Sequence, residues 1–181
     1  MMTEHPPPDA PLPPPLFDFL HFDLSATLID RAGIMAINSH RGDALQLDRI
    51  VWLNPDRSRA LAVKEVGHHE WWAAGHLPQK PLYPAALMIE AAAQLASLLF
   101  QVKDVPEYEF VGFTALDNTR IFFLPKPGDH LVMLAKDVKF NVRRMVCDVQ
   151  GYVDGRISFE ARITGMPFSP KGGAISEVPT Q

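Results

Sequence analysis

The chain has 181 residues, of which 47% are hydrophobic and 21% charged, and its formal net charge is −4. This length is typical of a single domain, and the composition excludes wholesale disorder. The acidic balance argues against a dedicated binder of nucleic acid, which would carry a large basic excess. Because Cys147 is the only cysteine, no internal disulfide can form, and this favours a reducing, cytoplasmic location.

Proline dominates the beginning of the chain, and seven of the 17 prolines fall in the first fifteen residues. Proline removes backbone donors and favours extended geometry. We therefore expect a proline-rich flexible tail at residues 1–15, a single domain at residues 16–167 and a flexible C-terminal tail at residues 168–181. Within residues 16–38 we expect a short helix or two, with Ser25 as a cap and Gly33 as a breaker.

Alternating and β-branched runs joined by turn-forming residues predict strands on both sides of one apolar helix, residues 85–100. This helix is shorter than the roughly 20 residues that a bilayer requires, so no membrane span is expected. The expected strands are 49–53, 59–66, 109–116, 119–124, 130–142, 145–152 and 156–164. Alternation predicts one buried face made of Met145, Cys147, Val149, Ile157, Phe159, Ala161 and Ile163. The pattern indicates an α+β fold in which an antiparallel sheet packs its concave face on the helix.

The few polar residues of the predicted helix form a single stripe. Glu90, Gln94, Ser97 and Gln101 are spaced by four, three and four residues, so they face one shared cavity or interface. Burial disfavours the charged form of a carboxyl, which makes Glu90 a candidate proton donor. The alternative is a solvated surface stripe in which Glu90 bonds to Gln94 and water.

A proline-rich segment, GHLPQKPLYP at residues 75–84, leads into the helix and contains His76. Its prolines restrict the backbone, so His76 is expected to lie in a fixed place near the helix start. An imidazole near a buried carboxyl makes His76 and Glu90 a candidate base and acid. The nearby HHE run, residues 68–70, lacks the second histidine of HExxH because Ala73 stands there, and no metal site is expected.

The stretch GHLPQKPLYPAALMIEAAAQ, residues 75–94, resembles the GHFPxxPxxPGVLxxEAxAQ pattern of the 3-hydroxyacyl-[acyl-carrier-protein] dehydratases, which have the hot-dog fold. Upstream, residues 40–50 resemble the family's HRYPFLLVDR segment, and residues 127–129 resemble its PGD turn. The similarity covers roughly residues 38–167. It implies a lyase of fatty-acid and related lipid metabolism, which removes water from 3-hydroxyacyl thioesters to give trans-2-enoyl thioesters.

The resemblance also implies roles for individual residues. His76 is the base for the C2 proton, and Glu90 is the acid for the departing hydroxyl. The N–H of Ala85 donates to the thioester carbonyl, and Gln94 orients the carboxyl of Glu90 or holds the released water. The acyl tunnel candidates are Leu87, Ala86 and Trp72.

The chain departs from the family pattern at three places. Gln79 and Ala85 replace glycines, and Gly42 to Ala44 replace Tyr-Pro-Phe. A backbone donor survives the methyl group of alanine, so Ala85 bears on rate and acyl specificity more than on the reaction type. The change at Gly42 to Ala44 is expected to alter the shape of the tunnel mouth.

The implied substrate is an acyl thioester on the phosphopantetheine of an acyl carrier protein, with no further cofactor. The resemblance also implies a homodimer with sites shared between protomers, and it allows a trimer of dimers. Candidates for a basic rim facing the acidic carrier are Arg120, Lys126, Lys136, Lys139, Arg143 and Arg144. Two alternatives remain open: a hot-dog thioesterase in which Glu90 activates water, and a non-catalytic homologue that binds acyl chains.

Overall fold

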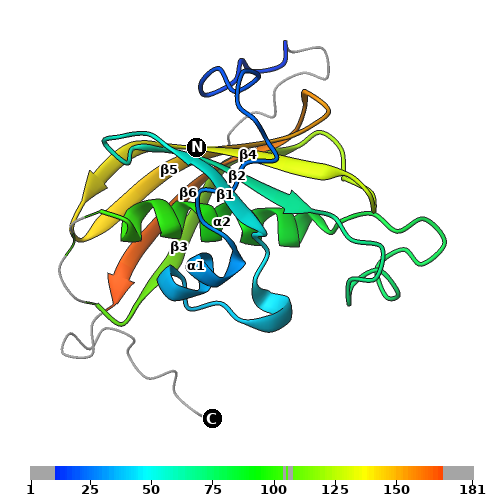
Figure 1. The fold of residues 1–181 in the computed structure, drawn as a ribbon, viewed down its shortest axis with the longest axis horizontal. Helices are drawn as coiled ribbons and strands as arrows, with labels where there is room; N and C mark the ends of the chain where they lie inside the picture. The colour runs from blue at the N-terminus through cyan, green and yellow to red at the C-terminus, as the bar shows by residue number, and fades with distance from the viewer. Residues whose placement is uncertain (1–10, 104, 106–107, 169–181) are drawn as a thin grey trace, which may run out of the picture.

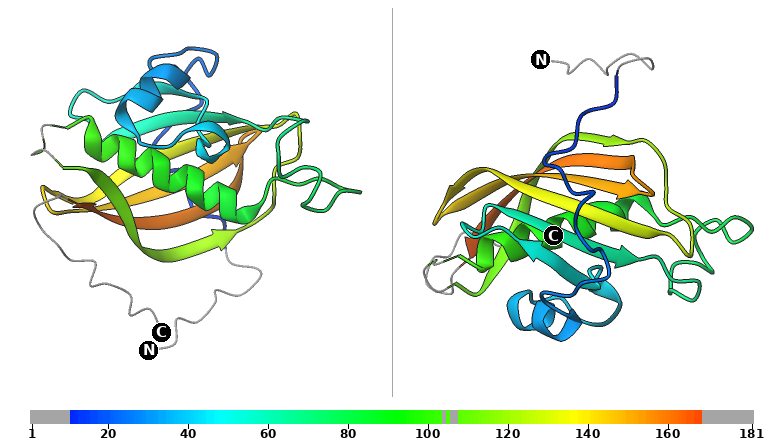
Figure 2. Two further views of the ribbon diagram at one scale, coloured as in Figure 1. Left: turned by 90° about the horizontal axis from the view of Figure 1, so that it is seen from below. Right: turned by 45° about the horizontal axis from the view of Figure 1, so that its top comes forward.

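The computed structural model describes residues 11–103, 105 and 108–168. Its elements are α1 (Arg31–Ile37), the short 3-10 helix η1 (Gly42–Ala44), β1 (Arg49–Leu53), β2 (Arg59–Glu65), α2 (Ala85–Gln101), β3 (Phe110–Ile121), β4 (His130–Asn141), β5 (Arg144–Val153) and β6 (Arg156–Phe168). The six strands form one antiparallel sheet in the order β1-β2-β4-β5-β6-β3. The sheet curls around α2 (Figures 1 and 2). The predicted architecture, an antiparallel sheet wrapped around a long apolar helix, is confirmed.

Helix α2 lies in the hollow of the sheet because it is apolar on most of its sides. Leu95, Leu98 and Leu99 are fully buried and belong to the main core cluster. The same cluster contains inward-facing side chains of β2, β4, β5 and β6. Burying one leucine side chain contributes about 1.5–3 kcal/mol, so these three residues hold the helix firmly on the sheet.

The prediction of two strands within residues 109–124 is wrong, because one long strand, β3, replaces them. Its pairing with β6 shifts between Phe113 and Ala115 and again between Asp117 and Arg120. Such bulges bend a strand and interrupt its alternation. In the sequence, this interruption resembles the end of one strand and the start of another.

The predicted buried face of the β5–β6 hairpin is confirmed for six of its seven residues. Ile157 is the exception, because it packs on the outer face of the sheet. Gly151 pairs with Phe159 whereas Tyr152 pairs with Ile157, which leaves Ser158 as an extra residue in β6. One extra residue reverses the side to which the following side chains point.

The predicted cap and breaker near α1 are also wrong. The helix is capped by Asp30, whose Oδ1 accepts from the N–H of Gly33 at 2.8 Å. Ser25 instead donates from its hydroxyl to Asp23 at 2.6 Å, before the helix. Gly33 lies inside α1, where a Cβ would come within 2.6 Å of Ile29. Close packing, rather than helix termination, explains this glycine.

The N-terminal segment 16–24 crosses the outer face of the sheet (Figure 2, right). Phe19 is buried there against Tyr152, with ring centroids 4.8 Å apart. Phe22 packs against Trp52, also with centroids 4.8 Å apart. The segment therefore covers apolar side chains on the face opposite α2.

Residues 1–10 and 169–181, which form most of the two predicted tails, lie outside the described residues. Closer to the domain, the carbonyl of Pro14 accepts from the Gln150 amide at 3.1 Å. No helix in the described part of the chain is long and apolar enough to cross a membrane.

Cys147 lies in the core and is 1% exposed. Burial raises the pKa of its thiol far above the usual value, and the thiolate is the reactive form. We therefore expect the native protein to react only slowly with a disulfide reagent such as DTNB at about pH 8, and the denatured protein to react fully. Rapid, complete labelling of the native protein would contradict the position of this residue in the core.

Candidate active site

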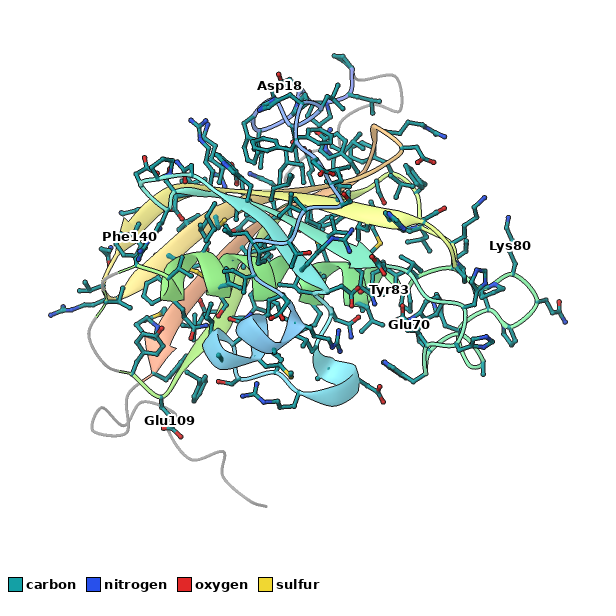
Figure 3. All side chains as sticks on the ribbon, in the orientation of Figure 1. Asp18, Glu70, Lys80, Tyr83, Glu109 and Phe140 are labelled. Carbon is teal, nitrogen blue, oxygen red and sulfur yellow. The ribbon has the colours of Figure 1, made fainter. Side chains whose placement is uncertain are left out.

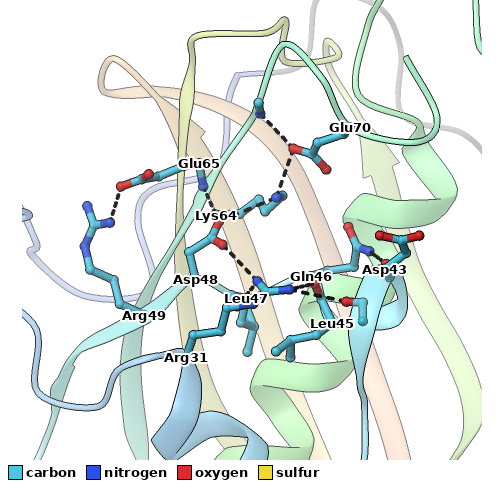
Figure 4. A network of polar contacts seen from close by, with 12 residues as sticks. Arg31, Asp43, Leu45, Gln46, Leu47, Asp48, Arg49, Lys64, Glu65 and Glu70 are labelled. Atoms are coloured by element: carbon cyan, nitrogen blue, oxygen red, sulfur yellow. Dashed lines mark hydrogen bonds and ion pairs between the residues drawn. The ribbon is translucent and has the colours of Figure 1, made fainter. Parts of the chain in front are cut away.

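The segment between β2 and α2 projects beyond one end of the sheet and is anchored at its start by Glu70 (Figure 3). Oε1 of Glu70 accepts from the N–H of Gly67 at 2.7 Å, and Oε2 accepts from the indole of Trp72 at 2.9 Å. The ammonium of Lys64, whose side chain is 7% exposed, lies 3.0 Å from Glu70 and 3.5 Å from Asp48 (Figure 4). A buried cation requires such partners, so this network fixes the start of the segment.

His76 is held through both its backbone and its ring. Its N–H donates to the carbonyl of Trp72 at 2.7 Å, and Nδ1 lies 3.0 Å from the carbonyl oxygen of Leu82. A carbonyl can only accept, so Nδ1 is a donor, and in the neutral ring Nε2 has the lone pair. The next residue, Leu77, has a φ of 54°, which bulky residues rarely adopt. Such backbone strain concentrates at functional sites.

The start of α2 offers backbone donors. Pro84 occupies the N-cap and provides no side-chain hydrogen bond. The first N–H groups of a helix have no acceptor within the helix, and the helix dipole makes this end positive. The N–H of Ala85 therefore lies where a carbonyl oxygen that gains negative charge can be bound.

Gln94 is fully buried and contacts Glu90. Its Nε2 donates to Oε1 of Glu90 and to the carbonyl of Ala44, both at 2.7 Å. Its own Oε1 accepts from the N–H of Gln46 at 2.9 Å, so the orientation of the amide is fixed. The Glu90 side chain is 40% exposed in the single chain, so it is partly solvated and bonded to Gln94, as in the alternative of a solvated stripe.

His40 also contacts the carboxyl of Glu90. The sequence alone assigned His40 no chemical role. Its Nε2 lies 3.3 Å from Oε1 of Glu90. Both residues line a pocket of about 70 Å³. The remaining walls of this pocket are Ala93, Gln94, Ser97, Val111, Phe113, Met145 and Ile163. A small, mostly apolar pocket with one carboxyl at its wall is a suitable place for the reacting end of an acyl chain.

The single chain does not bring His76 into this pocket. Among the described residues, Glu90 has polar contacts with His40 and Gln94, and His76 is not one of the lining residues. The predicted base and acid thus lie on neighbouring elements of one chain, without a contact between their side chains.

The predicted tunnel residues also lie outside the pocket beside Glu90. Trp72 is buried against Tyr83, with ring centroids 5.6 Å apart. Leu87 packs against the core, and Ala86 is exposed on the first turn of α2. These three residues surround the beginning of α2, whereas the pocket opens further along the helix.

The predicted basic residues occupy different surroundings. Arg120 pairs with Glu160 on the neighbouring strand. Lys139, Arg143 and Arg144 are exposed around the turn between β4 and β5. This turn directly precedes Met145, which lines the pocket beside Glu90. Of the predicted basic residues, those at this turn are therefore the ones that directly adjoin a pocket-lining residue in the sequence.

Comparisons with known proteins identify the family to which this chain is similar. The model of the FabA-like domain matches residues 38–162. A similar protein is the 3-hydroxyacyl-[acyl-carrier-protein] dehydratase FabZ of Polynucleobacter asymbioticus, with 35% identity over 136 residues, which cover 75% of this chain and 91% of that protein. The protein of the same name from Streptococcus sanguinis is 31% identical over 137 residues, which cover 76% of this chain and 96% of that protein.

Solved structures show the same fold at much lower identity. The dehydratase heterocomplex ApeI:P from Xenorhabdus doucetiae superposes with a TM-score of 0.64 and 9% identity, covering 76% of this chain and 91% of that one. Cj0977 from Campylobacter jejuni gives a TM-score of 0.59 and 17% identity, covering 80% and 94%. The predicted hot-dog fold is confirmed. Because the matched region 38–162 spans more than half of the chain and includes His76, α2 and most of the sheet, the chain belongs to the family of FabA-like domains.

Proposed function

We propose that this protein is a 3-hydroxyacyl-[acyl-carrier-protein] dehydratase of fatty-acid synthesis. Relatives that carry this name are 31–35% identical over most of the chain. The observation that carries the proposal is the Glu90 carboxyl, which the buried Gln94 amide orients at the wall of an apolar pocket. His76, held by its Nδ1 near the start of the same helix, supplies the imidazole that a second copy would bring to such a carboxyl. A base, an acid and a backbone donor are the groups that dehydration of a thioester requires.

In the proposed reaction, Nε2 of His76 takes the proton from C2 of the 3-hydroxyacyl thioester. The carbonyl oxygen gains negative charge and accepts from the N–H of Ala85. The electron pair of the C2–H bond then forms the C2=C3 double bond, and the C3–O bond breaks. Protonated Glu90 gives its proton to the departing hydroxyl, which leaves as water. Transfer of the proton from His76 back to Glu90 through solvent restores the enzyme.

A second copy of the chain would complete the site. The β1 edge of the sheet is covered by Ile29, which exchanges backbone hydrogen bonds with Ile50. The β3 edge pairs with no further strand in the described part of the chain, and its Phe113 and Leu116 are 50% and 41% exposed. Exposed apolar edges of this kind are suited to pairing with another chain. Because Phe113 also lines the pocket of Glu90, a copy paired along β3 would cover that pocket and could bring its own histidine to it.

We therefore propose a homodimer with two shared sites, which can assemble further into a trimer of dimers.

The substrate would arrive on the phosphopantetheine arm of an acidic acyl carrier protein, attracted by the exposed basic turn of Lys139, Arg143 and Arg144. The acyl chain would begin in the apolar pocket beside Glu90. Leu87, Ala86 and Trp72 stay candidates for the tunnel wall in the dimer, and the lone thiol of Cys147 agrees with a cytoplasmic location.

The reaction can be run in reverse to separate the proposal from its alternatives. With a trans-2-enoyl thioester, we expect the conjugated enoyl absorbance to disappear without release of free thiol. Release of thiol would support the thioesterase alternative, and binding without turnover would support the non-catalytic homologue. A series of thioesters of graded length then gives the preferred acyl chain.

A further inference from the structure

Both polar contacts of the Glu90 carboxyl end on the same oxygen. Gln94 Nε2 lies 2.7 Å from Oε1, and His40 Nε2 lies 3.3 Å from it. No described residue forms a hydrogen bond with Oε2. In a protonated carboxyl, the carbonyl oxygen is the stronger acceptor. The contacts on Oε1 therefore favour Oε2 as the position of a proton on this carboxyl.

The surroundings of His40 determine which of its nitrogens is the donor. Nδ1 is buried and has no hydrogen-bond partner among the described residues. A proton on Nδ1 would be a buried donor without an acceptor, which is costly. Nε2 lies 3.3 Å from Oε1 of Glu90. The tautomer of the neutral ring that carries its proton on Nε2 therefore has the better-placed donor.

The backbone that carries His40 is fixed by the polar stripe of α2. Asn38 donates from Nδ2 to the carbonyl of Gln94 at 2.9 Å and accepts from Gln101 at 2.7 Å. This backbone segment runs from Asn38 to Gln46. At its Gln46 end, the hydroxyl of Tyr83 donates to Oε1 of Gln46 at 2.7 Å. Burial raises the pKa of Tyr83, so this hydroxyl stays a donor at all working pH values.

We infer that His40 is a positioning residue for Glu90: its Nε2, 3.3 Å from Oε1, holds that oxygen and leaves Oε2 as the oxygen that carries the transferable proton. The inference rests on the proposed function, because it concerns the acid of that reaction. His40 and Glu90 are the titratable residues that line the pocket. The walls from β3, β5 and β6 are apolar: Val111, Phe113, Met145 and Ile163. His40 is therefore the titratable side chain that faces Glu90 in this pocket.

The test compares two variants in the dehydration direction, with a 3-hydroxyacyl thioester as substrate. His40→Phe removes the donor and keeps a planar ring, and we expect kcat to fall about tenfold while KM changes less than about twofold. The alkaline limb of the kcat profile should move to higher pH, since an N–H donor binds a carboxylate more strongly than a neutral acid. His40→Gln supplies an uncharged N–H donor and should restore most of kcat and of the profile.

Ser39→Ala, at an exposed neighbouring position, is the matched control and should leave all parameters unchanged. A folded His40→Phe protein with wild-type kcat and an unmoved alkaline limb would overturn the inference. If His40→Phe does not fold, His40→Asn serves instead, because its shorter amide does not reach Oε1 and should give the same loss. An inactive wild type would overturn the proposed function, and this inference with it.

Discussion

Replacement of Glu90 by glutamine is expected to lower kcat for dehydration by at least about 100-fold. Glutamine keeps the volume of the side chain and can still accept from Gln94 and His40, but it has no acidic proton to give. The Glu90 side chain is 40% exposed, so the free energy of unfolding should change by less than about 0.5 kcal/mol. The measurement is kcat with a 3-hydroxyacyl thioester, together with a thermal melt.

Glu109→Gln, at an exposed position outside the pocket, is the matched control and should keep wild-type kcat. The pH profile provides an independent check, because its alkaline limb reports ionisation of the acid. If Glu90→Gln retains wild-type turnover with that limb unmoved, the acid of the reaction is another residue.

Replacement of His76 by alanine should also lower kcat by roughly 100-fold or more, because no other group then takes the C2 proton. The variant loses one hydrogen bond, from Nδ1 to the carbonyl of Leu82, which contributes about 0.5–1.5 kcal/mol. The anchor at Glu70 is untouched, so the segment should keep its position. His69→Ala, at an exposed position of the same segment, is the control. Unchanged kcat in a folded His76→Ala protein would reject His76 as the base.

Much of the fold could be predicted from the sequence because its main elements have strong local patterns. The residues of α2 are apolar on most sides of the helix, which predicts burial. In the β5–β6 hairpin, apolar and polar residues alternate over most of its length. The prediction failed where the pairing between two strands changes the alternation that the sequence of one strand suggests. The extra residue Ser158 turns Ile157 to the outer face, and no local preference announces such a bulge.

In the candidate site, too, contacts between residues close in sequence could be predicted and contacts between distant residues could not. Glu90 and Gln94 were predicted because they lie one helical turn apart, and their hydrogen bond at 2.7 Å confirms that they interact. His40 was missed as a contact of Glu90 because only the tertiary fold brings these two residues together. The link from Tyr83 to Gln46 was missed for the same reason. Residues distant in sequence leave no periodic pattern from which to infer contact.

In the proposed dimer, each site combines His76 of one protomer with Glu90 of the other, and this arrangement can be tested by mixing subunits of two variants. Neither His76→Ala nor Glu90→Gln dimers contain an intact site. A mixed dimer contains one site with both changes and one with neither. After complete exchange at equal amounts, half of the dimers are mixed, so we expect about a quarter of wild-type activity to return. Activity that stays at the level of the separate variants, although native mass spectrometry shows mixed dimers, would contradict the shared site.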